Sequence, residues 1–360
     1  MTSESFPRLA LLQIALALLT FAGGSRALAQ PASAGDSGAH PIFYAAPPAG
    51  FDAVAAGDAE LAQYGIPPRP ERSSPAFAVW LKLVTTSQTR LTNPKWQITD
   101  IVNGTPTDLR LAGELDNTTL MNNSSWNAYA VTGPNGYFKL NSSWVASSWD
   151  EPGIGTEFCA YGPFIAGQWV GLDGLNDNDV LQAGVSVSGC PTAYVAWYEW
   201  YTLGCTSNEA GCSQTNLDIP INVNDEVNVE VWYTTAAPNG HAYIWDQTTQ
   251  QSVSVGFNQP SGDPGSGYAG NSAEVVVERP LTYSGLANLA NYTPFYMQGC
   301  AVDSYACGGN PAWTNYNVTM TCPPWNPSNW CPSGGANLSV VNLNTESWLL
   351  YFTPGGPTLQ

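Results

Sequence analysis

Polar and apolar residues alternate with a period of two through much of the chain, which predicts β-strands with one buried face. In residues 226–233 the valines fall on one face, and polar residues and Trp232 fall on the other. In residues 180–188 the apolar face and the polar face separate in the same way. The apolar positions of that segment are Leu181, Ala183, Val185 and Val187, and the polar ones are Gln182, Gly184, Ser186 and Ser188.

Further strands are predicted at intervals of ten to twenty residues, between clusters of Gly, Pro, Asn and Asp. Residues 194–202 are rich in aromatic residues, and alternation turns Tyr198 and Trp200 toward the core, opposite Glu199. Residues 242–255 indicate a hairpin around 246–249. Long strands with one polar face predict an all-β fold, an antiparallel β-sandwich with a groove on one face. After residue 29, residues 53–64 are the one segment that favours a helix.

The N-terminal part of the chain differs in composition from the rest. Residues 1–29 are typical of a secretory signal peptide, with Arg8, an apolar run and a small-residue Ala-Leu-Ala site. We therefore expect a secreted protein, extracellular or periplasmic, that has no membrane contact after signal cleavage. Residues 30–72 are rich in Ala, Pro and Gly and are interpreted as a linker or pro-region. Residues 73–120 form a basic pro-segment or N-terminal extension, and residues 121–360 form the β-sandwich domain.

Charge divides the chain more sharply than its average suggests. The net charge of −18 excludes nucleic acid as a partner, because phosphates need a basic surface. Residues 69–110 hold six basic and three acidic residues, whereas from Gly113 onward 20 acids accompany two basic residues, Lys139 and Arg279. One interpretation is a pro-segment that inhibits its own domain and is released in acid as a fragment ending between about Arg110 and Ser124. The alternatives are an acidic surface that serves solubility, or an N-terminal β-extension that stays attached.

All eight cysteines lie after residue 150, in a chain that we expect to be exported to a compartment where disulfides persist. Eight cysteines allow 105 pairings, and sequence does not choose among them. Short spacings favour three local disulfides, Cys205 with Cys212, Cys300 with Cys307 and Cys322 with Cys331, which leaves Cys159 with Cys190. No CxxC motif indicates a zinc or redox site.

The residue inventory narrows the chemistry. Two histidines, His40 and His241, make a His-ligated metal site or a Ser–His–Asp triad a poor interpretation, and Lys139 lies in no recognisable motif. The acidic loop 173–179 has a weak calcium-binding character, without the spacing of an EF-hand. Acid–base chemistry by carboxylates remains. In residues 273–280 two acids, Glu274 and Glu278, share one face of a predicted strand.

Four segments in register resemble the glutamic peptidases (eqolisins), over roughly residues 124–352. The segments that carry the resemblance are QWVGLDG at 168–174, VLQAG at 180–184, AWYEW at 196–200 and AEVVVERP at 273–280. The resemblance implies an antiparallel β-sandwich of two long, curved sheets, concanavalin-like or jelly-roll-like. It implies a pepstatin-insensitive endopeptidase that acts at acid pH. It also implies a catalytic dyad of Gln182 and Glu278, with Trp126, Trp169, Asp173 and Glu199 lining or supporting the cleft. We expect protein or peptide substrates, a monomer, no metal and no cofactor.

A rival of a different class is a secreted carbohydrate-binding protein or glycosidase on a β-sandwich. Abundant Trp and Tyr suit stacking on sugars, and a pair of carboxylates such as Glu199 and Glu278 suits glycoside hydrolysis. Gln182 separates the two classes, because a glycosidase needs a second carboxylate where the glutamic peptidases have an amide. A catalytically inactive adhesion protein is a third interpretation.

Overall fold

The computed structural model describes residues 40–104, 110–115, 118–155, 164–175, 177–189, 191–205, 210–262, 267–282, 285–321, 336–344 and 347–354. The chain divides into Met1–Ser37, which contains the expected signal peptide and lies outside the described residues, and Gly38–Gln360, which holds everything described below. Within the described part, no helix is long and apolar enough to cross a membrane.

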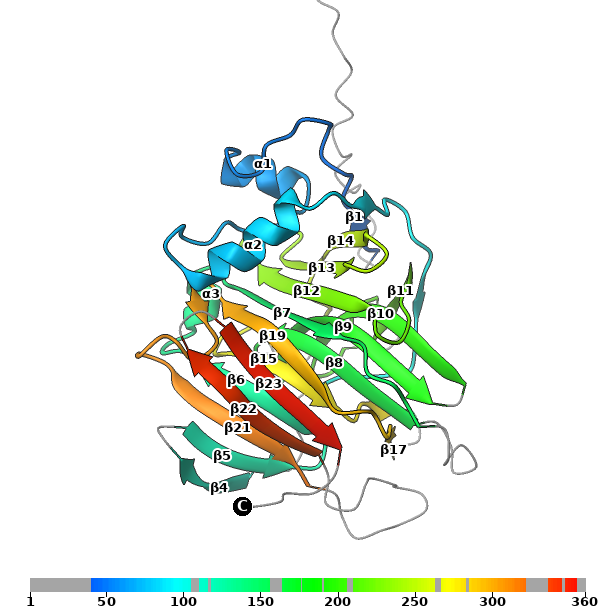
Figure 1. Ribbon diagram of the computed structural model, residues 1–360, viewed down its shortest axis with the longest axis vertical. Coiled ribbons are helices and arrows are strands. Elements are labelled where there is room, and N and C mark those ends of the chain that lie inside the picture. Colours follow the sequence, from blue (N-terminus) through cyan, green and yellow to red (C-terminus); the bar gives the residue numbers. More distant parts are fainter. Residues whose placement is uncertain are drawn as a thin grey trace, which may run out of the picture. The chain divides into compact units, whose positions relative to one another are not determined.

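Strand pairing forms two β layers, as predicted (Figure 1). The first layer contains, in spatial order, β3 (Trp96–Ile98), β11 (Thr215–Pro220), β10 (Thr192–Thr202), β9 (Asp179–Gly189), β8 (Phe164–Leu172), β15 (Ser272–Glu278), β6 (Trp126–Thr132), β21 (Thr314–Met320), β5 (Thr118–Asn123) and β4 (Arg110–Leu115). The second contains β1 (Ile42–Phe43), β14 (Gln251–Phe257), β13 (Gly240–Asp246), β12 (Glu226–Tyr233), β7 (Trp144–Asp150), β19 (Phe295–Val302), β23 (Ser347–Pro354) and β22 (Ala336–Asn344).

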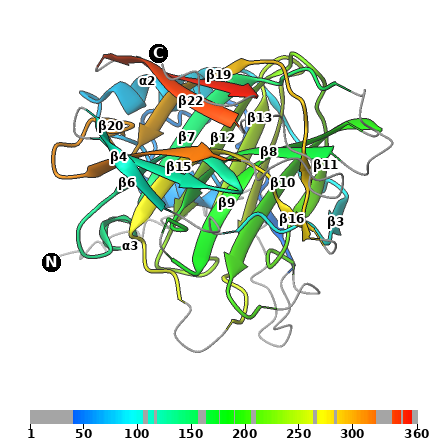
Figure 2. The ribbon, with the colours of Figure 1, turned by 90° about the horizontal axis from the view of Figure 1, so that it is seen from below.

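Short strands complete the layers. They are β2 (Thr89–Arg90) beside β14, β18 (Asn288–Leu289) beside β8, β20 (Tyr305–Ala306) beside β19, and the pair β16 (Leu281–Thr282) with β17 (Gly285–Leu286). The layers join where Met320, at the end of β21, pairs with Ala336 of β22, the last strand of the second layer. At one edge of the first layer β3 lies beside β11 (Figure 2).

The main core lies between the layers and confirms the predicted faces. Val227, Val229 and Val231 of β12 pack there against the alternate apolar residues of β9. Tyr198 and Trp200 also lie in this core, as alternation predicts. The opposite faces of β6, β8, β10 and β15 carry a second apolar cluster that includes Trp126, Trp169 and Val276. One strand therefore serves the core with one face and an outer surface with the other.

The helical content is partly mispredicted. Helix α1 (Asp58–Gln63) lies inside the segment for which a helix is predicted, but α2 (Pro75–Thr85) and α3 (Tyr137–Leu140) are not expected from the sequence. The signals for α2 are present, since Ser74 caps its first turn through Phe77 N–H and Pro75 occupies the first helical position. The surrounding Pro-rich and Ser-rich residues favour a linker, and that composition obscures the cap.

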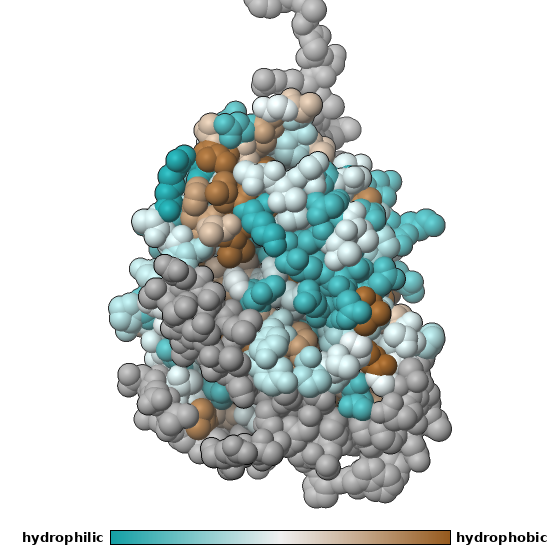
Figure 3. All heavy atoms as spheres, in the orientation of Figure 1, coloured by the Kyte–Doolittle hydropathy of each residue, from teal (hydrophilic) through white to brown (hydrophobic). Residues whose placement is uncertain are grey.

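Residues 40–104, called the leader here, are attached to both layers. Strands β1 and β2 pair with β14, and β3 pairs with β11. Helix α1 packs on α2 around Trp80, whose indole N–H donates to the Pro67 carbonyl at 2.9 Å. Apolar residues gather on the surface near α1 and α2, whereas hydrophilic residues prevail over the centre of the same view (Figure 3).

Two of the expected disulfides are present. Cys205 bonds to Cys212, and Cys300 bonds to Cys307, which confirms the local pairings predicted from spacing. The expected pairs Cys322–Cys331 and Cys159–Cys190 lie outside the described residues.

Candidate active site

The outer face of the first layer brings residues of four neighbouring strands into one row, and three of these residues are polar. Gln182 on β9 lies opposite Glu199 on β10 and opposite Gly171 on β8, and Gly171 lies opposite Glu274 on β15. Residues directly opposite in a sheet share a face, so alternation places Glu278, four residues after Glu274, on the same surface. Sequence reasoning places these side chains on polar faces, and the register now places the faces side by side.

Glu278 lies at the end of β15, enclosed by two indoles. Its Oε2 accepts a hydrogen bond from Trp169 Nε1 at 2.9 Å, and Trp169 packs edge-to-face on Trp126 with ring centroids 5.0 Å apart. Burial raises the pKa of the Glu278 carboxyl well above its ordinary value, while the indole N–H groups of Trp169 and Trp126 oppose that increase. The Trp126 N–H faces the carboxyl without meeting hydrogen-bond geometry.

Gln182 is fully buried, and its side-chain amide lies on the same outer face of the sheet as Glu278. Its Nε2 donates to the carbonyl oxygen of Asn103, whereas its Oε1 has no hydrogen-bond partner within the described structure. Space for this arrangement depends on Gly171, because a Cβ there would lie 2.8 Å from the Trp169 ring and 3.3 Å from Gln182 Cβ. A glycine on the central strand thus lets a large indole and the amide lie over adjacent strands.

A single peptide unit joins Gln182 to Glu278. The carbonyl of Asn103 accepts from Gln182, and the N–H of the next residue, Gly104, donates to Glu278 Oε1 at 3.4 Å. The carbonyl oxygen and the following amide nitrogen belong to one planar peptide group. The Gln182 amide and the Glu278 carboxyl therefore contact the same peptide group. The predicted dyad is brought together on one surface.

Glu199 supports the same peptide from the neighbouring strand. Its Oε2 accepts from the Asn103 backbone N–H at 2.9 Å and from Asn103 Nδ2 at 3.1 Å. Asn103 Nδ2 also donates to Gln214 Oε1 at 3.1 Å. Burial raises the pKa of Glu199, and the negative charge of Glu278 raises it further, so the two carboxyls are close enough to interact.

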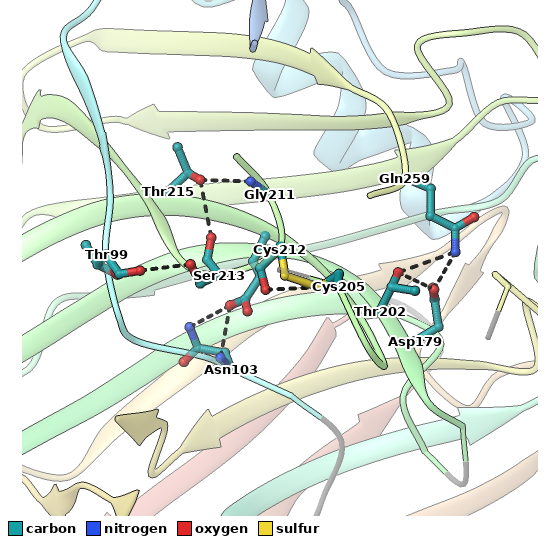
Figure 4. Close-up of a disulfide and its surroundings, with 11 residues drawn as sticks. Thr99, Asn103, Asp179, Thr202, Cys205, Gly211, Cys212, Ser213, Thr215 and Gln259 are labelled. Carbon is teal, nitrogen blue, oxygen red and sulfur yellow. Dashed lines mark hydrogen bonds between the residues drawn. A yellow bond between two sulfur atoms is a disulfide. The ribbon is translucent and has the colours of Figure 1, made fainter. Parts of the chain in front are cut away.

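Residues 99–104, called the plug here, lie along this row as an extended segment. The Thr99 N–H donates to the Gln214 carbonyl at 3.1 Å, and the Gln214 N–H donates to the Ile101 carbonyl at 2.8 Å. On the other side Val102 and Leu281 exchange two backbone hydrogen bonds of 2.8 Å. Figure 4 shows Thr99 and Asn103 on this segment, with the Thr99 carbonyl accepting from Ser213 Oγ beside the Cys205–Cys212 disulfide.

Asp173 is the one predicted site residue that lies apart from this group. Its carboxylate accepts the backbone N–H groups of Ala269, Gly270 and Asn271 at 2.7 to 3.1 Å. Burial raises its pKa to about 8, and the neighbouring Asp177 contributes to the increase. Asp173 thus fixes the loop before β15. In the described part of the chain no group of three or more His, Cys, Asp or Glu side chains has an arrangement that would hold a metal ion.

Sequence reasoning therefore finds Trp126, Trp169, Gln182, Glu199 and Glu278 in one place, but it misses three residues of the site. Asn103 and Gly104 belong to the expected pro-segment, and no pattern in them predicts contact with the dyad. Gln214 follows a cysteine loop and carries no motif. The two backbone pairings of the plug join residues more than 100 positions apart, which local patterns do not encode.

Comparison with known proteins gives one family, and the similar solved structures include two glutamic peptidases. The model of the family described as "Peptidase A4 family" matches residues 124–318, more than half of the chain. The structure of scytalido-glutamic peptidase with a transition state analog inhibitor is similar at 19% identity and a TM-score of 0.45, covering 64% of this chain and 98% of that one. Aspergilloglutamic peptidase from Aspergillus niger is similar at 22% identity and a TM-score of 0.32, covering 53% and 99%. No curated protein matches. Because both TM-scores lie below 0.5, the family model carries the comparison.

Proposed function

This chain belongs to the Peptidase A4 family, and from that premise we propose that it is a secreted acid endopeptidase that uses Glu278 and Gln182. One observation supports the assignment of roles. A peptide group of the chain itself lies between the two side chains, with its carbonyl on the Gln182 amide and its N–H on Glu278. A substrate peptide in the same position would have its carbonyl carbon and its leaving nitrogen within reach of both groups.

In the proposed reaction the ionised Glu278 carboxylate takes a proton from a water molecule, which then attacks the peptide carbonyl. The Gln182 NH₂ donates a hydrogen bond to the oxygen on which negative charge develops. Glu278 then gives its proton to the leaving nitrogen, and the C–N bond breaks. The position of the Gly104 nitrogen, 3.4 Å from Glu278 Oε1, supports that last transfer, because a protonated Glu278 carboxyl would lie near the nitrogen that has to accept its proton.

The same geometry supports activity in acid. Burial raises the pKa of Glu278, and the Gly104 N–H of the plug opposes that increase. If water entered the site, burial would fall and the pKa would move toward the ordinary glutamate value of about 4.3. An open site would then hold an ionised base under mildly acidic conditions. Gln182 does not titrate, so the oxyanion donor persists at any pH at which the fold persists.

The leader supports the proposal of a precursor. The plug fills the space that a substrate would need, so we infer that the chain as described is an inhibited form. The two disulfides support export to an oxidising compartment, where such bonds persist.

The test is digestion of casein or haemoglobin at about pH 3 to 4 by the purified protein, with pepstatin and a chelator present. Glu278→Gln is expected to abolish digestion. Glu274→Gln is the matched control, because Glu274 shares the strand and the face with Glu278 but lies four residues before it, and in the described structure its carboxyl makes no hydrogen bond to the plug. Retention on a polysaccharide column without any digestion would contradict the proposal and favour the carbohydrate-binding rival.

A further inference from the structure

The plug is bound as a substrate strand would be bound, and not as a loop that happens to cover the site. Main-chain hydrogen bonds join Thr99 and Ile101 to Gln214 on one side, and Val102 to Leu281 on the other. The Asn103 backbone N–H donates to the Glu199 side chain. Such pairing on both sides is the way extended peptides are recognised by addition to a sheet. All of these contacts lie before the Asn103–Gly104 bond, on the side that would become the acyl fragment.

The Asn103 side chain is recognised as well. It is fully buried, and its NH₂ group donates to both Glu199 and Gln214. Ser186 Oγ donates to the same Gln214 oxygen at 2.8 Å, which fixes that amide with its oxygen toward Asn103. The pocket therefore presents acceptors, and an amide side chain supplies the donors that they need.

We propose that Asn103–Gly104 is a peptide bond that this protein hydrolyses in its own chain. The proposal rests on the proposed function and adds its first substrate. Water adds to the Asn103 carbonyl carbon while Glu278 removes its proton and Gln182 holds the oxygen. The C–N bond then breaks, the Gly104 nitrogen takes the proton from Glu278, and the products are an Asn103 carboxyl group and a Gly104 amine. The atoms balance with one water consumed.

Hydrolysis of this bond would also weaken the binding of the plug to the site. The new Asn103 carboxylate would lie beside Glu199 and Glu278, and three carboxyl groups in a buried space repel one another when they ionise. The rest of the leader keeps its own attachments, the pairing of β1, β2 and β3 and the packing of α2. The expected product is a two-chain protein with an open site, cut upstream of the range between Arg110 and Ser124 that charge suggests.

The experiment follows the chain itself. The purified protein is incubated from about pH 2 to pH 7, and fragments are identified by intact mass and N-terminal sequencing. We expect one new N-terminus at Gly104 and one new C-terminus at Asn103, formed at a rate that does not depend on protein concentration, because the bond is cut within one molecule. Glu278→Gln should slow this cut at least ~100-fold, since general base catalysis contributes that much. A Glu278→Gln chain cut at the parental rate would mean spontaneous cleavage at Asn-Gly and would overturn the proposal.

Two substitutions at residue 104 give a matched pair. Gly104→Pro removes the N–H that donates to Glu278, and the chain should then stay whole at this bond. Gly104→Ala keeps the N–H, and its Cβ would lie 3.6 Å from the Tyr201 ring, an ordinary contact, so this chain should be cut. Equal cutting of both variants would contradict the assignment. Thermal unfolding of each variant checks that it folds.

Casein digestion by the same samples separates this proposal from the proposed function. Digestion of casein by a chain that stays whole between residues 103 and 104 would overturn self-cleavage and leave the peptidase standing. A protein that cuts neither casein nor its own chain would overturn both proposals.

Discussion

The leader covers the outer faces of both β layers, but it does so with two different kinds of contact. On the first layer the plug touches Gln182, Glu199 and Glu278, and the contacts are hydrogen bonds to polar side chains. On the second layer α2 places Ala76 and Leu83 on a patch of aromatic residues. The residues of that patch are Trp144, Trp232, Tyr243 and Trp245, together with Ala146 and Ala301.

The two contacts of the leader, called the first cover (the plug on the first layer) and the apolar cover (α2 on the second layer), differ in what can replace them. A substrate peptide can make the hydrogen bonds that the plug makes, so the plug is exchangeable at small cost in free energy. No small polar molecule replaces the apolar surface that α2 buries, at roughly 25 cal/mol for each Å² removed from water. The first cover is therefore suited to regulation and the second to permanent attachment. Both contacts come from one stretch of 65 residues, 40–104.

Two polar side-chain atoms under the plug have no hydrogen-bond partner among the described residues. Under the plug, Gln182 Oε1 and Glu199 Oε1 are buried without a hydrogen-bond partner in the described structure. A buried polar atom of this kind costs about 1–3 kcal/mol, which the fold tolerates here in a place where water and substrate would supply the missing bonds.

The largest expected effect concerns the Gln182 amide. Gln182→Ala should lower kcat for casein by ~10²–10³-fold, because one oxyanion donor is lost. Gln182→Met, which fills a similar volume without an amide, should lose as much. The measurement is initial rate against substrate concentration. Full activity in Gln182→Met would show that the side chain fills space and donates nothing.

The next effect tests the apolar cover. Leu83→Ala removes a buried side chain, 2% exposed, from the contact between α2 and the aromatic patch. The free energy of unfolding should fall by about 2–5 kcal/mol. Leu140→Ala, at a leucine that is 76% exposed on α3, is the control and should change stability by less than about 0.5 kcal/mol. Urea unfolding measures both. A loss in Leu83→Ala no larger than the control would mean that α2 is not held by burial.

A third prediction concerns a carboxyl under the apolar cover. Glu230 on β12 lies between Ala146 and Tyr243, is fully buried, and has no hydrogen-bond partner for either oxygen in the described residues. Burial raises its pKa to about 8. The group therefore contributes stability that is complete below its unfolded pKa of about 4.5 and is lost as pH rises toward 8.

Stability should accordingly fall between about pH 5 and pH 7, by at most ~3 kcal/mol from this one group. Glu230→Gln and Glu230→Met remove the titration, and both should flatten the dependence of unfolding free energy on pH relative to the parent. Parallel curves for parent and variants would show that Glu230 ionises freely. The direction of this pH dependence also concerns the leader. A carboxyl group that is protonated when α2 covers it stabilises the covered state in acid.

Much of this comparison was accessible from sequence, and the rest was not, for a physical reason. Alternation in residues 226–233 predicts which side chains of β12 enter the core, since the period of two is fixed by the strand itself. The same alternation puts Gln182 and Glu278 on polar faces, and the resemblance to the glutamic peptidases pairs them. The plug depends on contacts of Val102 with Leu281 and of Thr99 with Gln214, and nothing in those four residues specifies the partner. Helix α2 is not predicted, because the Pro-rich stretch before it favours a linker. Its start nevertheless carries typical helix signals, Ser74 as the N-cap and Pro75 as the first helical residue.

The smallest expected effect tests whether opposite charge holds the leader to the body. The basic leader and the acidic body suggest it, yet among the described residues one ion pair joins them, Lys82 Nζ to Glu226 Oε1 at 3.0 Å. Its lysine side chain is 57% exposed, and exposed pairs contribute roughly 0.2–1 kcal/mol. Arg90 instead donates to the Tyr64 carbonyl and lies over the Tyr243 ring, contacts that do not require an acid.

Lys82→Gln should therefore lower the unfolding free energy by less than about 1 kcal/mol, and so should ~1 M NaCl, where screening acts within about 3 Å. Urea unfolding of the parent and the variant at low and high salt measures both effects. A loss of more than about 2 kcal/mol of unfolding free energy in high salt would mean that opposite charge holds the leader. It would then support the interpretation that the leader is released in acid, when the carboxylates are neutralised. A small loss leaves burial and strand pairing as the forces that attach the leader. Cutting the chain between residues 103 and 104 would then be the way to open the site, because neither salt nor acid weakens those forces enough.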